Sequence, residues 1–244
     1  SLEDNLDIAI DLMGYTKNNK LGIFKNRIAP IQINYLGYPG TIGADYFDYI
    51  IADHILIPTD QKQFFSEKII YMPHSYQPND NRLVVSNLDT TKSDYGLPDT
   101  GIVFCCFNQN YKIGIKEFNV WMKVLKKINN SVLWLIDSNK WAKQNIFKQA
   151  ELNNINSSRI IFANKISHLE HLERHKHADL FLDTFNYNAH TTASDSLRCG
   201  LPIITKQGNQ FAARVSSSLL SALDLRELVA KTDDEYENLI IKYA

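Results

Sequence analysis

The chain has 244 residues, of which 44% are hydrophobic and 22% charged, and its formal net charge is −1. This composition is ordinary for a globular protein with a sizeable core, and the lack of net positive charge disfavours a nucleic-acid partner. No apolar run approaches the ~18 residues of a membrane-spanning helix, and no signal segment opens the chain, so we expect no membrane partner and a cytoplasmic location. Three cysteines, two of them adjacent at Cys105 and Cys106, form no disulfide framework and indicate a reducing compartment.

Residues 1–90 contain four strand-like segments separated by short loops rather than by long helices. The segments are LDIAIDL, IQINYL, FDYIIA and KIIYMP. Gly and Pro punctuate the loops, as in GYPGTIG at 37–43, and the polar, turn-rich stretch 77–94 predicts a linker. Because no partner unit precedes the first strand, we expect residues 1–90 to be the C-terminal portion of a truncated α/β lobe.

From residue 96 onward, apolar runs of strand length alternate with segments of helical length. The runs are IVFCCF, SVLWLI, RIIFA, DLFLDTF, LPIIT and ELVA. Strands that are apolar throughout and alternate with helices are typical of a parallel sheet covered on both faces. Residues 91–244 are therefore expected to form one α/β domain with a doubly wound, Rossmann-like parallel sheet.

The loops after these strands are the first place to look for chemistry, because ligands of open parallel sheets bind beyond the carboxyl ends of the strands. The loop NQNYK at 108–112 places three amides, a phenol and an ammonium before a predicted helix. Lys112 could neutralise a phosphate there as a point charge. The alternative is a solvent-exposed loop lysine.

A second polar segment, at 164–179, contains His168, His171 and His175 at helical spacings of three and four. Such a face can hold a metal ion. No cysteine or further acidic motif accompanies it, and its order differs from HExxH, so we expect no metal and favour solvent-exposed helix histidines.

A third polar segment, NAHTTASD at 188–195, lies between the runs DLFLDTF and LPIIT. A helix is expected to begin near His190, and its first N–H groups, which lack internal partners, would attract an anion such as a phosphate. Asp195, one turn later, could accept a hydrogen bond from a ribose hydroxyl. The alternative is capping by Thr191 without a ligand, which explains one threonine but not the whole His-Thr-Thr cluster.

Several common sites are excluded by their missing motifs. The chain has no G-x-G-x-x-G after a strand, no G-x-x-x-x-G-K-[ST] loop and no G-x-S-x-G elbow. Nicotinamide enzymes, P-loop NTPases and serine hydrolases of the elbow type are therefore disfavoured. Cys105 and Cys106 lie inside an apolar run and are expected to be core residues.

Long motifs in the right order closely resemble the catalytic region of the protein O-GlcNAc transferase family, which includes the plant SPINDLY proteins and bacterial homologues. The resemblance covers nearly the whole chain. It is carried by APIQINYLGYPGTIGADYFDYIIAD, SEKIIYMPHSYQPND, FCCFNQNYKI, LFLDTFNYNAHTTASDSLRCGLPIIT and FAARVSSSLL. It implies a GT-B glycosyltransferase, in which two Rossmann-like lobes face a cleft, with a UDP-sugar as substrate and no cofactor or metal.

The resemblance also implies which residues bind the donor. In the second lobe, Lys112, with Gln109 beside it, contacts the UDP diphosphate and carries the catalytic role. His168 stands near the ribose, where animal enzymes have lysine, and Asp195 is the acid close to the same sugar. The other donor-binding residues implied are His171, Arg174, His190, Thr191 and Thr192, the last three meeting the diphosphate and sugar. In the first, acceptor-side lobe, the LGYPGT loop lines the sugar and acceptor through Leu36, Gly37, Pro39 and Thr41.

The implied reaction is an inverting transfer of N-acetylglucosamine from UDP-GlcNAc to Ser/Thr hydroxyls of a protein acceptor. GDP-fucose or UDP-glucose as donor, or a noncatalytic nucleotide-sugar-binding module, stay open as alternatives. The family's base-side histidines lie upstream of Ser1, and its acceptor-presenting tetratricopeptide array is missing here. We therefore expect this stretch to be inactive alone. The long insert of animal enzymes is also missing, which indicates a bacterial or plant type.

Overall fold

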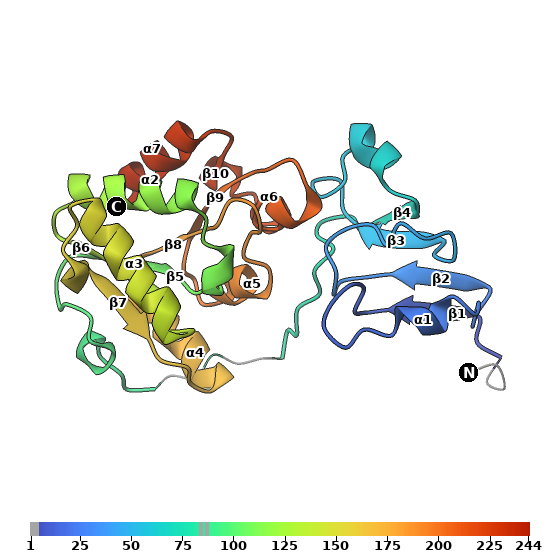
Figure 1. Cartoon of the computed structure of the whole chain (residues 1–244), viewed down its shortest axis with the longest axis horizontal. Coiled ribbons are helices and arrows are strands. Elements are labelled where there is room, and N and C mark those ends of the chain that lie inside the picture. The colour runs from blue at the N-terminus through green and yellow to red at the C-terminus, as the bar shows by residue number, and fades with distance from the viewer. Residues whose placement is uncertain (1–4, 83–84, 86–87) are drawn as a thin grey trace.

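The computed structural model describes residues 5–82, 85 and 88–244, which form two lobes, each built on its own parallel sheet (Figure 1). The two sheets confirm the predicted α/β class. Part of the predicted linker, residues 83, 84, 86 and 87, lies outside the described residues. The boundary between residues 90 and 91 falls in the connection between the sheets and stays a prediction. No helix in the described part of the chain has the length and apolarity to cross a membrane.

The first lobe consists of four parallel strands in chain order, as expected from its four apolar segments. They are β1 (Ile8–Asp11), β2 (Ile31–Asn34), β3 (Tyr49–Ala52) and β4 (Lys68–Tyr71). Only short helices lie between them: α1 (Leu21–Phe24) and the 3₁₀ helix η1 (Thr59–Phe64).

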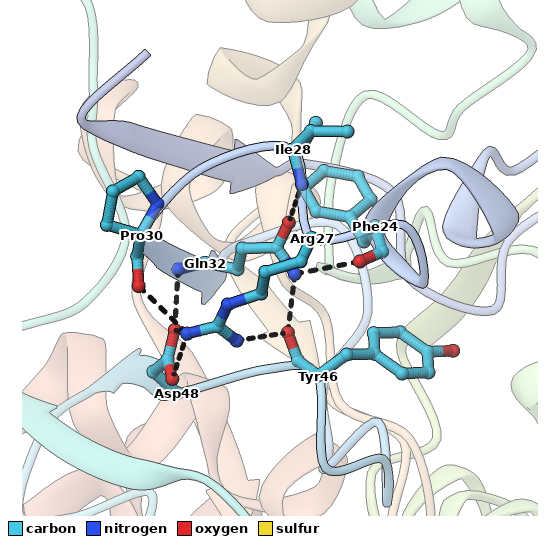
Figure 2. Close-up of polar contacts among 7 residues, drawn as sticks. All are labelled: Phe24, Arg27, Ile28, Pro30, Gln32, Tyr46 and Asp48. Atoms are coloured by element: carbon cyan, nitrogen blue, oxygen red, sulfur yellow. Dashed lines mark hydrogen bonds and ion pairs between the residues drawn. The ribbon is translucent and has the colours of Figure 1, made fainter. Parts of the chain in front are cut away.

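A network of polar contacts joins α1 to β2 and to the segment before β3 (Figure 2). The buried Gln32 amide donates to the carbonyls of Phe24 (2.9 Å) and Tyr46 (2.5 Å) and accepts from the Ile28 N–H (3.0 Å). Arg27 forms a two-pronged ion pair with Asp48, at 2.7 and 2.8 Å. These contacts satisfy buried polar groups beside the small hydrophobic cluster that includes Phe24 and Phe47.

The second lobe has six parallel strands in the order β7-β6-β5-β8-β9-β10. The strands are β5 (Ile102–Cys106), β6 (Ser131–Ile136), β7 (Ile160–Ala163), β8 (Leu180–Leu182), β9 (Ile203–Lys206) and β10 (Val229–Ala230). The chain therefore winds outward from β5 to β7, returns to the centre and winds the other way from β8. This is the Rossmann order, and its switch point, where a ligand crevice forms, lies between β5 and β8.

Helices follow the strands as the alternating pattern predicts. The α-helices are α2 (Ile115–Lys127), α3 (Lys140–Leu152), α4 (His168–Arg174), α5 (Thr191–Arg198), α6 (Val215–Ala222) and α7 (Asp233–Tyr243). The 3₁₀ helices are η2 (Lys92–Tyr95), η3 (Asn110–Lys112), η4 (Ser157–Arg159), η5 (His175–His177), η6 (Phe211–Ala213) and η7 (Arg226–Leu228). Side chains cap several of them: Asn139 accepts from Ala142 N, Ser167 from Glu170 N and Thr232 from Glu235 N.

The strands of the second lobe are buried on both faces because helices cover them. Phe104, Trp134 and Phe181 are fully buried, and Cys105 and Cys106 are fully buried as predicted. Trp121 of α2 donates to the Tyr236 hydroxyl of α7 (3.1 Å), which donates in turn to the Asp183 carbonyl (2.9 Å). This chain of hydrogen bonds connects the helix layer to the end of β8.

One hydrophobic cluster extends across both lobes, while a second, smaller cluster around Phe24 and Phe47 lies within the first lobe. Ile50, Leu56 and Tyr76 of the first lobe belong to the same buried cluster as the strands of the second lobe. The Tyr76 ring packs edge-on against Phe211, with ring centroids 5.2 Å apart. The lobes are therefore held together by apolar packing and not only by the connection between them.

Asp53 is the polar centre of this contact. Its buried carboxylate accepts hydrogen bonds from the N–H groups of Ile55 and Leu56 and from Tyr76 N, each at 3.0 Å. The Ser218 hydroxyl of α6 donates to the same carboxylate at 2.6 Å. One acidic side chain therefore fixes a first-lobe turn, the start of the connection and a second-lobe helix.

We expect Asp53→Ala to lower the free energy of unfolding by about 3 kcal/mol, because it leaves several buried donors without an acceptor. Urea denaturation followed by circular dichroism measures the change. Asp99→Ala, which removes an exposed carboxylate, is the matched control and should unfold like the unaltered chain. Equal stability of the two variants would contradict the role given to Asp53.

Candidate functional site

A cavity of about 510 Å³ opens between the lobes at the carboxyl ends of β5 and β8, where the Rossmann order predicts a ligand. Its walls come from both lobes, including Tyr76 and Asn79 from the first. Residues predicted from the sequence that line it are Leu36, Gly37, Lys112, His190, Thr191, Thr192 and Asp195. The structure therefore brings together residues that are more than 150 positions apart in the sequence.

A buried carboxylate, Asp183, organises the floor of this cavity. It follows β8 directly, and its Oδ1 accepts from the N–H groups of Thr184 (2.8 Å) and Ala189 (2.7 Å). Its Oδ2 accepts from the Thr205 hydroxyl (2.7 Å) on β9. Burial raises the pKa of Asp183, while these hydrogen bonds oppose the rise. Asp183 was not predicted from the sequence, although an acidic residue at the end of the apolar run DLFLD was a signal that could have indicated it.

Asn108, also missed from the sequence, connects the loop after β5 to the start of α5. Its buried amide nitrogen donates to the Thr184 hydroxyl (2.9 Å), and its oxygen accepts from the Thr192 hydroxyl (3.1 Å). The loops that follow β5 and β8 are therefore held in one fixed arrangement.

Lys112 lies at the end of η3 with its ammonium turned into the site. Its Nζ donates to the Asn188 carbonyl (3.0 Å) and sits 4.0 Å from the centre of the Tyr187 ring. Burial lowers the pKa of Lys112 to about 8, an effect that the charge of Asp183 opposes. The alternative of a solvent-exposed loop lysine is wrong, because the side chain is half-buried and has defined partners.

The start of α5 differs from the capping alternative. His190, not Thr191, is the N-cap residue, and no side chain accepts a hydrogen bond from the first turn of this helix in the described residues. Thr191 is the first helical residue, and Thr192 uses its hydroxyl to bind Asn108. The helix therefore presents an uncapped, partly positive end to the cavity.

His190 is held as a neutral ring. It stacks on Tyr187, with centroids 4.7 Å apart and planes 23° apart, and its Nε2 lies 3.2 Å from the Ala212 carbonyl, so this nitrogen carries the proton. Burial and, secondarily, the charge of Lys112 lower the pKa of His190 to about 4.

A second cavity, of about 420 Å³, adjoins the first and is lined by Gln109, His168, His171 and Arg174. His168 Nε2 lies 3.3 Å from Asp195 Oδ2, so this pair forms the partition between the two cavities. Arg174 is buried, donates to the Asn164 carbonyl (2.8 Å) and stacks over the Phe107 ring. Burial lowers the pKa of His171 to about 3.

The expectation that the three histidines are solvent-exposed is wrong for two of them. His175 is 1% exposed, and its Nδ1 lies 2.7 Å from the His171 carbonyl; His171 is half-buried and only His168 is exposed. Hydrophobic packing under α4 is the reason, since the rings of His171 and His175 both contact Phe107. Within the described residues, no group of three or more His, Cys, Asp or Glu side chains is arranged to hold a metal ion.

Pro39 and Thr41 are the predicted residues that neither cavity includes. The Thr41 hydroxyl donates to Glu67 (2.5 Å) and accepts from Gly43 N (2.9 Å), so it holds its own loop in place. A further cavity of about 530 Å³, beside α3, is lined by no charged side chain and offers nothing to balance an anion.

Comparison with known proteins gives a consistent result. The profile described as "Glycosyl transferase family 41" matches residues 2–89 and 81–244. A probable UDP-N-acetylglucosamine–peptide N-acetylglucosaminyltransferase SEC of Arabidopsis thaliana is 36% identical over 99% of this chain and 25% of its own length. The SPINDLY homologue of Eustoma exaltatum is 34% identical over 99% of the chain and 26% of its own length. The chain thus spans about a quarter of the length of these curated relatives.

Among solved structures, an O-GlcNAc transferase variant of Thermobaculum terrenum superimposes with a TM-score of 0.91 and 26% identity, covering 99% of this chain and 46% of that one. A glycosyltransferase of Rickettsia africae shares the fold alone, with a TM-score of 0.56 at 10% identity over 99% of this chain and 73% of that one.

The buried, neutral His190 predicts a loss of stability in acid. In the unfolded chain the imidazole takes up a proton near pH 6.5, whereas in the folded chain it does so only near pH 4. Between these values the unfolded state binds more protons, so stability falls as the pH falls. We expect the unaltered chain to lose about 2 kcal/mol more than His190→Gln between pH 7 and pH 5.

Urea denaturation at the two pH values measures this difference. The contribution of His171 is present in both proteins and cancels in the comparison. His74→Gln, which replaces an exposed imidazole, controls for the replacement of histidine by glutamine and should lose as much stability in acid as the unaltered chain. A His190→Gln variant that loses as much stability in acid as the unaltered chain would contradict a neutral buried His190.

Proposed function

Because the chain belongs to glycosyl transferase family 41, we propose that it forms the donor-binding part of an enzyme that transfers N-acetylglucosamine from UDP-GlcNAc to Ser/Thr hydroxyls of proteins. Membership confirms the family resemblance, and the superposition on the Thermobaculum terrenum enzyme confirms the GT-B fold.

One observation carries the proposal: Lys112 and the uncapped start of α5 converge on one cavity at the switch point of the sheet. Lys112 has no carboxylate within 4.0 Å among residues 5–82, 85 and 88–244, so its charge is available to a ligand. A cation and a helix N-terminus together favour an anion of high charge density, such as a diphosphate.

The second cavity supports the placement of the nucleoside. Arg174 Nε and His171 Nδ1 are buried atoms without hydrogen-bond partners in the described part of the chain, and both residues line this cavity with Gln109. Phe107 adds a flat apolar wall. We assign the base to this cavity, the diphosphate to the first, and the ribose to the partition formed by His168 and Asp195.

The chemistry follows from the charge that the reaction creates. Attack of the acceptor hydroxyl oxygen on the anomeric carbon forms the new glycosidic bond and breaks the bond to the diphosphate. Negative charge is left on the diphosphate oxygen, and the hydroxyl proton passes to a general base or to solvent water. Lys112 and the first N–H groups of α5, which carries Thr191 and Thr192, are already oriented to stabilise that charge without a metal ion. Attack from the opposite face makes the transfer inverting. Leu36 and Gly37 would border the sugar and acceptor.

GDP-fucose and UDP-glucose are the alternative donors, because His168 replaces the lysine of animal enzymes at the nucleotide. A noncatalytic nucleotide-sugar-binding module is the alternative of another class. We further propose that transfer needs more than these 244 residues, given that the relatives are about four times as long, and that the protein acts in the cytoplasm without a cofactor.

We expect Lys112→Ala to reduce sugar transfer at least ~100-fold in the full-length protein, the scale of losing one donor that stabilises the transition state. Transfer of radiolabelled sugar to protein measures the loss. Lys116→Ala, which removes an exposed lysine of α2, should retain full activity. Undiminished turnover of Lys112→Ala would contradict the assignment.

Calorimetric titration identifies the nucleotide and separates the two cavities. We expect UDP to bind and GDP not to bind, and Lys112→Ala to weaken UDP while leaving uridine, which lacks phosphates, unaffected. Arg174→Gln should weaken both ligands, because Arg174 lines the cavity assigned to the base. Binding of GDP in preference to UDP would replace the proposal with fucosyl transfer.

A further inference from the structure

The Tyr187 ring contacts two groups that line the diphosphate cavity. Lys112 Nζ is 4.0 Å from the ring centre, and the His190 ring is stacked on Tyr187 at 4.7 Å. Tyr187 itself lines the cavity. Tyr187 lies within the stretch LFLDTFNYNAHTT, but it is not among the residues to which the family resemblance gives a role.

The way Lys112 is held suits a ligand-binding cation. A carboxylate at ion-pair distance would hold the ammonium but would also cancel its charge and compete with an incoming anion. The face of an aromatic ring attracts a cation through its quadrupole and leaves the charge intact. The Asn188 carbonyl, 3.0 Å away, is the other contact of Nζ and is likewise uncharged. Asp183, Cys106 and His190 are the titratable groups whose charges couple to Lys112.

The ring is in turn fixed by the network below it. The Thr184 hydroxyl donates to the Tyr187 carbonyl (2.6 Å), and Thr184 N donates to the buried Asp183 carboxylate (2.8 Å). Asn188 Nδ2 donates to the Thr184 carbonyl (2.7 Å). The backbone on both sides of the ring is thus held to the end of β8, so the ring is a rigid surface for the lysine.

We propose that Tyr187 is a positioning residue for the diphosphate site: its ring holds the Lys112 ammonium in place without neutralising it and stacks the uncharged His190 beside it. The inference rests on the proposed function for the identity of the ligand. The contact between the ring and the ammonium stands on the geometry alone.

Site-specific replacement of Tyr187 by phenylalanine and by 4-fluoro-, 3,5-difluoro- and 3,4,5-trifluorophenylalanine tests the proposal in the 244-residue chain. The shape of the ring changes little while its attraction for a cation falls stepwise. We expect the pKa of Lys112, measured by NMR titration of its ¹³Cε signal, to fall by about 0.5–1 across the series. A packing role would leave that pKa unchanged.

UDP affinity at pH 7.5, measured by calorimetry, should fall in the same order by about 1.5- to 3-fold, because less of Lys112 is protonated as its pKa falls from about 8. Uridine binding should not change. The same fluorinated series at Tyr243, whose ring contacts Lys242 at 4.9 Å and lines neither of the two cavities assigned to the donor, is the matched control and should leave Lys112 and UDP binding unaffected.

If the pKa of Lys112 is the same in all four Tyr187 variants, the inference is overturned, whatever their affinities for UDP are. A stepwise fall in the pKa of Lys112 without any change in UDP affinity would overturn the positioning role. If the unaltered chain binds no UDP, the proposed function fails separately, and the titration of Lys112 still decides whether the ring holds the ammonium.

Discussion

Everything at the candidate site depends on a buried carboxylate at the point where the sheet changes its direction of winding. Asp183 follows β8 and gathers donors from its own loop and from β9, while Asn108 extends the network to the loop after β5. A buried acid is tolerated only when its oxygens are satisfied by hydrogen bonds. Meeting that requirement fixes the loops that present Lys112, Tyr187 and the start of α5.

The main electrostatic feature of the site is the convergence of Lys112 and the start of α5 on one cavity. The carboxylates that line this cavity, Asp80 and Asp195, form no ion pair with Lys112 in the described residues. Lys112 is held by a carbonyl and a ring, and α5 begins without a side-chain cap. His190, stacked beside them, stays neutral and therefore adds no charge that would alter with modest changes of pH. The cavity is thus arranged to receive a multiply charged anion, such as the diphosphate of the proposed donor.

The sequence predicted the architecture well because continuous apolar runs and their alternation with helices are local features. It also predicted Lys112 and the His-Thr-Thr cluster, which lie in loops that a parallel sheet brings to one edge. Asp183, Asn108 and Tyr187 were missed because their importance comes from partners across the fold. The alternative that Thr191 caps α5 is wrong, and the burial of His175 was missed, because backbone geometry and packing decide both.

The contact between the lobes has a consequence for how this family can vary in length. Two contacts fix how the lobes sit against each other: Asp53 with Ser218, and Tyr76 with Phe211. The connecting chain is held near each of its ends. Arg198 donates to the Asp80 carbonyl at one end, and Thr90 bonds to His177 at 2.9 Å at the other. Extra residues between these ties add little closure cost and disturb neither lobe.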